Sequence, residues 1–128
     1  KPVEEYDTFD APYANAGRLH EAGVKLCFRS DSASNSRNVP FEAAQAVAYG
    51  LPADVALRGV TLTSAEVLGQ SDHIGSITAG KLANLIITDG SPLQPTTQIK
   101  GILIEGHPFQ PESRQTRFYE KYRARLAK

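Results

Sequence analysis

The first helical pattern of the chain lies in residues 10–23. Three apolar side chains recur there at a spacing that places them on one helix face: Ala16, Leu19 and Ala22. Asp10 is a suitable N-cap residue, a proline follows in the first turn, and Gly23 suits the position just after a helix end. The pattern therefore predicts a helix of about three turns.

A short apolar run, VKLCF, follows this helix directly and alternates as a strand does. The predicted inner face carries Val24, Leu26 and Phe28. We expect a strand over residues 24–28, with Cys27 as a core cysteine. Asp31 and the polar loop SASNSRN come next. In many α/β enzymes a catalytic or binding side chain follows a strand at the carboxyl edge of the sheet, as Asp31 would here.

The middle third of the chain predicts helices. Residues 39–50 are rich in strong helix formers, with a proline near the start and a glycine at the end, and residues 51–61 repeat the early proline. Thr63 and Glu66 have the T-x-x-E spacing of a capping box, and Gly69 suits the end of that helix. We expect three successive helices here.

From about Gly75 the pattern changes to strands. Residues 85–88 and 102–104 are apolar runs bounded by glycine-containing turns. We expect these two strands to pair, and their continuous apolar character predicts burial on both faces. The tail predicts an amphipathic closing helix, because apolar side chains recur at every fourth position: Phe118, Tyr122 and Leu126.

Charge and length narrow the function classes. The 128 residues suffice for about one domain, and 14 basic against 14 acidic side chains leave no net charge to attract nucleic acid or an anionic membrane. One cysteine excludes an intramolecular disulfide. No apolar run approaches the roughly 20 residues of a membrane span, and the first ten residues lack the apolar region of a signal peptide. Because the chain contains no methionine, we expect a processed or truncated piece; its compartment is undetermined, with the cytoplasm favoured.

The most specific motif is LTSAEVLGQSDHIGSITAGKLANLIITDGSPL, residues 62–93. It combines A-x-x-L-G, G-S-I-x-x-G-K-x-A-N-L and a strand leading to an acid, on Ala65, Leu68, Gly69, Gly75, Ser76, Ile77, Gly80, Lys81, Ala83, Asn84, Leu85 and Asp89. With these residues the chain resembles the carboxyl-terminal part of the amidohydrolase superfamily, most closely its imidazolonepropionase-like members. A looser resemblance extends from about Asp10 to the end.

The resemblance implies an α/β fold in three parts. Residues 1–72 would form the last βα units of a (β/α)8 barrel. Residues 73–110 would form part of a composite β-sandwich, and residues 111–128 a C-terminal helix. The motif glycines would then serve as scaffold, since they permit a tight turn.

The resemblance also implies a role for Asp31. In the family, an aspartate at the end of the eighth barrel strand binds a catalytic divalent metal, zinc or similar, and accepts a proton from the attacking water. The alternative is a cap of a loop or helix. Arg29, two residues earlier on the same strand face, would pair with this carboxylate or bind an anionic substrate group. Asn35, Arg37 and Asn38 are candidates for substrate contact, and the alternative is a flexible turn with Asn38 as an N-cap.

The chain lacks the family's histidine ligands. These include an H-x-H pair on earlier barrel strands, whereas His20, His73 and His107 match no metal-site spacing. One aspartate cannot hold a catalytic metal by itself. The resemblance therefore implies about the last third of an enzyme, with its metal bound in the full-length parent and none bound by this chain alone.

Three functions stay open. The first is the C-terminal part of a metal-dependent amidohydrolase. This enzyme would cleave a carbon–nitrogen bond in a small-molecule substrate such as a cyclic amide or a related compound, and the piece alone would be inactive. The second is a non-catalytic module without metal, a homo-oligomer in which another copy covers exposed surfaces. The third is a fold-only relative that uses Arg29 for binding. Each predicts neither a nucleic-acid nor a membrane partner.

Overall fold

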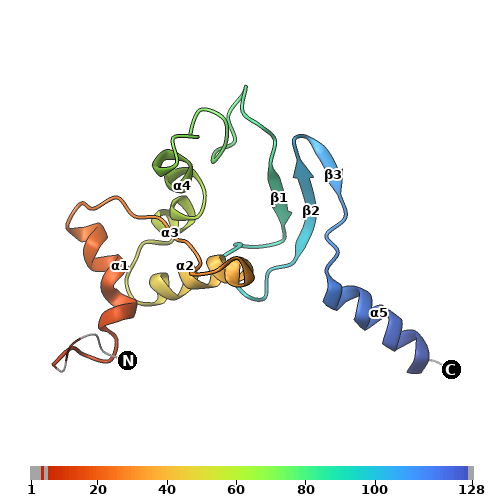
Figure 1. Ribbon diagram of the computed structural model, residues 1–128, viewed down its shortest axis with the longest axis horizontal. Helices are drawn as coiled ribbons and strands as arrows, with labels where there is room; N and C mark the ends of the chain where they lie inside the picture. Colours follow the sequence, from red (N-terminus) through yellow and green to blue (C-terminus); the bar gives the residue numbers. More distant parts are fainter. Residues whose placement is uncertain (1–3, 5, 127–128) are drawn as a thin grey trace.

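Helices and strands occupy separate parts of the chain (Figure 1). The computed structural model describes residue 4 and residues 6–126. The helices are α1 Ala11–Glu21, the 3-10 helix η1 Ala33–Asn38, α2 Val39–Ala48, α3 Ala53–Gly59, α4 Leu62–Val67 and α5 Arg114–Leu126. The strands are β1 Leu85–Thr88, β2 Ile99–Ile104 and β3 His107–Phe109. The helices predicted for residues 10–23, 39–50 and 51–61 and for the tail are confirmed.

The core lies among the first four α-helices. Helix α2 packs against α1 and α3, and α3 packs against α4. Small side chains allow these short helices to approach closely, and a Cβ added at the buried Gly17 of α1 would lie 3.4 Å from the backbone of Gly50 and Leu51. The central residues are Ala43, Ala46, Leu51, Ala56 and Leu93. Leu93 comes from the loop after β1, so this loop ties the sheet to the helices.

Leu51 is the largest fully buried side chain in this core, with 2% of its surface exposed. Replacing Leu51 by alanine is expected to lower the free energy of unfolding by about 2–5 kcal/mol, since it removes apolar contacts and leaves a cavity. Urea denaturation checks this value. Leu68→Ala is the matched control, because Leu68 is 71% exposed. Its effect should stay below about 1 kcal/mol, and equal losses for the two variants would contradict the observed core.

Helix α4 begins two residues earlier than the capping box predicts. Thr61 is its N-cap residue and makes no side-chain capping bond, while Thr63 lies inside the helix and is buried. The predicted capping box is therefore wrong: the Thr61 hydroxyl donates to the Leu57 carbonyl oxygen at 2.7 Å, at the end of α3. The predicted glycine stop is correct, because Gly69 has φ +66° and the next amide, of Gln70, donates to the Ala65 carbonyl oxygen at 2.8 Å.

The sheet has the order β1-β2-β3, and both pairs are antiparallel. The predicted pairing of the two apolar runs is confirmed, with Leu85 opposite Leu103. The predicted burial on both faces is wrong, because Ile86 and Ile87 are 52% and 55% exposed. Burial on two faces needs a covering layer on each, and no described helix packs on the sheet.

The strand predicted over residues 24–28 does not form. This segment leaves α1 without strand pairing and runs toward η1 (Figure 1). A strand needs a neighbour for its backbone groups. In the described part of the chain the Phe28 amide instead donates to the Gly59 carbonyl oxygen at 3.2 Å, and its ring lies over that glycine. Leu26 and Phe28 pack against the core as the alternation predicts, but Val24 is exposed, so the alternation is correct in part about burial and wrong about pairing.

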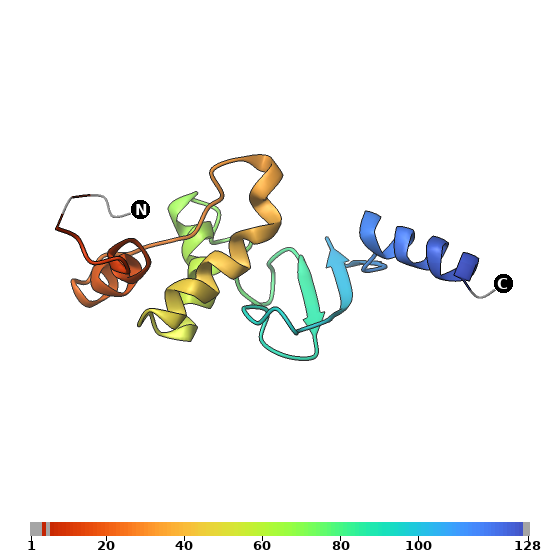
Figure 2. The ribbon, with the colours of Figure 1, turned by 90° about the horizontal axis from the view of Figure 1, so that it is seen from below.

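Helix α5 is amphipathic as predicted, but it does not close the structure. It extends away from the sheet in two perpendicular views (Figures 1 and 2). None of its described residues is buried, and it packs against no other described helix or strand. No helix within residue 4 and residues 6–126 has both the length and the apolar character needed to cross a membrane.

Candidate functional site

Asp31 lies in the exposed segment between α1 and η1. The Asn35 side-chain amide donates to Asp31 Oδ1 at 3.0 Å. The 3-10 geometry of η1 brings this amide back over the loop, and the Asn35 backbone amide also donates to the Ser32 carbonyl oxygen at 3.1 Å. The second carboxylate oxygen of Asp31 accepts no hydrogen bond from the residues that the structure describes, so it is open to a ligand.

The other predicted site residues surround this loop without forming one cluster. Arg29 and Arg37 are exposed, and neither forms an ion pair with Asp31 within the described residues. Asn38 occupies the N-cap position of α2, but its side chain makes no capping hydrogen bond. Asn35 alone is joined to Asp31, and the substrate-binding roles of all four residues stay predictions.

A divalent metal of the kind that the resemblance implies needs several converging ligands. Among residue 4 and residues 6–126, no three His, Cys, Asp or Glu side chains lie close enough together to hold one. The three histidines are distributed over α1, the turn after α4 and β3. The described residues therefore do not fit a complete metal site, and Asp31 is at most one ligand of it.

Cys27 is exposed rather than buried, so its assignment as a core cysteine is wrong. The reason is the missing strand pairing of residues 24–28. Leu26 and Phe28 pack against the helical core, whereas Cys27 lies on the opposite face and is exposed; Val24, predicted for the inner face, is also 46% exposed.

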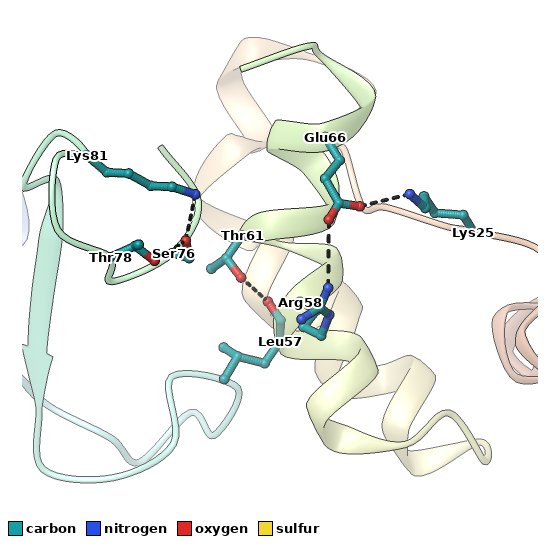
Figure 3. Close-up of polar contacts among 8 residues, drawn as sticks. All are labelled: Lys25, Leu57, Arg58, Thr61, Glu66, Ser76, Thr78 and Lys81. Atoms are coloured by element: carbon teal, nitrogen blue, oxygen red, sulfur yellow. Dashed lines mark hydrogen bonds and ion pairs between the residues drawn. The ribbon is translucent and has the colours of Figure 1, made fainter. Parts of the chain in front are cut away.

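A charged cluster that the sequence patterns did not predict holds this segment against the helices (Figure 3). Lys25 Nζ donates to Glu66 Oε2 at 2.9 Å, and Arg58 lies 3.8 Å from Glu66 Oε1. The Lys25 hydrogen bond is the main cause that lowers the pKa of the Glu66 carboxyl group below its ordinary value. In the sequence, Lys25 is a polar position of an alternating run and Glu66 is part of the predicted capping box, so neither pattern predicted their contact. The cluster links the segment that leads to Asp31 to α3 and α4.

The motif turn at residues 74–81 lies on the other side of α4 (Figure 3). Lys81 Nζ donates to the Ser76 hydroxyl at 2.7 Å, and the Lys81 backbone amide donates to the Thr78 carbonyl oxygen at 3.2 Å. Gly75, near the start of this turn, lies directly against α4: an added Cβ would lie 2.7 Å from Ala65 Cβ. These residues serve packing and turn formation.

Comparison with known proteins places this chain in a family. Residues 10–110 match the model of the amidohydrolase family. Amidohydrolase tasK of Hapsidospora irregularis is 37% identical over 62% of this chain and 8% of its own length. The imidazolonepropionase of Flavobacterium johnsoniae is 36% identical over 60% of this chain and 20% of its own length. The chain thus spans a fifth or less of these curated relatives.

Solved structures of amidohydrolases also resemble this chain. An amidohydrolase from Thermotoga maritima superposes with a TM-score of 0.72 at 27% identity, over 78% of this chain and 26% of that one. A zinc-bound adenosine deaminase from Xanthomonas campestris superposes with a TM-score of 0.55 at 29% identity, over 88% of this chain and 33% of that one. The predicted fold class is confirmed, and since the family model covers most of its residues, the chain belongs to the amidohydrolase family.

Proposed function

We propose that this chain is the C-terminal part of a metal-dependent hydrolase that cleaves a carbon–nitrogen bond, of a cyclic amide or a related group, in a small molecule. The observation that carries the proposal is the family match over residues 10–110, which includes Asp31. The imidazolonepropionase among the relatives supports a cyclic substrate, and the zinc in one solved neighbour supports a metal in the parent.

Asp31 is the catalytic group that this chain contributes. Hydrolysis of a carbon–nitrogen bond requires a base that takes a proton from the attacking water and returns it to the leaving amine. The exposed carboxylate of Asp31 suits this role, because Asn35 orients one oxygen and leaves the other open toward solvent. Arg29, Arg37 and Asn38 flank Asp31 in the sequence and are the side chains of this chain that would contact the substrate.

The chain alone has no hydrolase activity under this proposal. It spans 26% of the solved amidohydrolase that it resembles, and the described residues hold no group of three acidic, histidine or cysteine side chains that could bind a metal ion. The remaining ligands and most of the substrate pocket belong to the rest of the parent protein.

The test is a chimera in which the barrel portion of the Flavobacterium johnsoniae imidazolonepropionase is followed by this chain in place of the corresponding segment. The chimera should hydrolyse the relative's own substrate, while the chain alone should not. Activity of the barrel portion without this chain would contradict the proposal, because Asp31 would then be dispensable.

A further inference from the structure

The zero net charge of this chain conceals two oppositely charged parts. Residues 114–128 carry six basic side chains and one acidic side chain, whereas residues 1–113 carry eight basic and thirteen acidic ones. A basic arm therefore follows an acidic body. Such a separation creates an attraction between molecules that the total charge does not reveal.

The basic arm is helix α5, which its own chain leaves uncovered. Arginines stack on its aromatic rings: Arg114 lies 5.2 Å from the Phe118 ring centroid, and Arg125 lies 5.2 Å from that of Tyr122. Arg114, Arg117, Phe118 and Lys121 together line a hollow of about 370 Å³ on the helix. Arg117 pairs with Glu112 at 3.5 Å, so Arg114 and Lys121 are the cations around the Phe118 ring that this hollow offers to an acidic segment that also carries aromatic side chains.

A segment of this chemistry lies at the opposite end of the molecule. Just before α1, Glu4, Asp7 and Asp10 are exposed, and none of them forms an ion pair with a described residue. Between these acids Tyr6 and Phe9 are 93% and 74% exposed. The segment is therefore acidic and aromatic, the counterpart of α5.

We propose that α5 of one copy docks on the acidic segment before α1 of a second copy. The two surfaces lie at opposite ends of the elongated molecule in both perpendicular views, so they do not meet within one chain (Figures 1 and 2). An antiparallel pair related by a two-fold axis forms both contacts at once and closes as a dimer. Nucleic acid or an anionic membrane would suit α5 but would be repelled by the acidic body, whereas a second copy satisfies both parts. This inference does not depend on the proposed function.

Light scattering at low and high ionic strength tests the dimer. At about 0.02 M salt the wild-type chain should have twice the mass of one chain, and at about 0.5 M salt the mass should fall to that of one chain, because contacts between exposed charges are screened. The variant Arg114→Glu/Lys121→Glu should be a monomer at both. Arg29→Glu/Arg37→Glu changes the net charge equally on another exposed surface and should remain a dimer.

A charge swap separates a docking defect from misfolding. Glu4→Lys/Asp7→Lys should also give a monomer, and combining it with Arg114→Glu/Lys121→Glu should restore the dimer at low salt. A monomeric wild-type chain at low salt would overturn the proposal. So would an assembly that persists in the α5 variant, which would point to the exposed sheet face, or a combined variant that stays monomeric although each parent variant is folded by circular dichroism.

Discussion

Replacing Asp31 by asparagine is expected to lower kcat of the chimera by about 10²–10⁴-fold, the usual contribution of a positioned general base. Asparagine has nearly the size of aspartate, and its amide oxygen still accepts the hydrogen bond that Asn35 donates at 3.0 Å. The substitution therefore removes the proton-accepting group while it keeps the loop geometry. Steady-state kinetics on the relative's own substrate measures the change, and KM should change much less than kcat.

Asp54→Asn is the matched control for this experiment. Asp54 is an exposed aspartate in the first turn of α3, outside the loop of Asp31. Its replacement removes the same charge and should leave kcat unchanged. If Asp31→Asn also kept kcat within about threefold of the parent chimera, Asp31 would be a loop cap and not the base.

Replacing Gly75 by alanine is expected to cost about 2–5 kcal/mol of folding free energy. Gly75 has φ +93°, a conformation that costs an L-residue roughly 1–2 kcal/mol. Its added Cβ would also lie 2.7 Å from Ala65 Cβ and 2.9 Å from Leu62 Cα, both in α4. Relieving this overlap adds about 1–3 kcal/mol, because the loop must move away from a packed helix.

Gly80→Ala separates these two contributions. Gly80 has φ +91°, but an added Cβ there would have no other atom within 4 Å. Urea denaturation should therefore show the backbone cost alone for Gly80→Ala and the larger combined cost for Gly75→Ala. Equal costs would mean that the contact between the motif turn and α4 is not tight.

The elements set by local signals were predictable from the sequence. The helices around Ala16 and Ala43 follow from helical periodicity with a proline at the start and a glycine at the end. The strand Leu85–Thr88 follows from a β-branched apolar run between turns, and its pairing with β2 follows from proximity in sequence. Each of these signals is local: it lies within about ten residues of the helix or strand that it predicts.

The incorrect predictions depend on partners that sequence patterns do not specify. The run Val24 to Phe28 alternates as a strand does, but it has no neighbouring strand in the described chain. Cys27 and Ile86 are exposed for the same reason, since burial needs a covering layer. At the site, the loop near Asp31 was indicated by sequence, whereas the Lys25–Glu66 ion pair joins residues 41 positions apart and carried no recognisable local signal.

Zinc content of the purified chain tests the central claim most directly. If Asp31 is one ligand of a site that the rest of the parent completes, the chain dialysed after incubation with zinc should retain far less than one ion per molecule by elemental analysis. One tightly held zinc per chain, lost in Asp31→Asn, would contradict the account, because this chain would then complete a metal site without the remainder of a hydrolase.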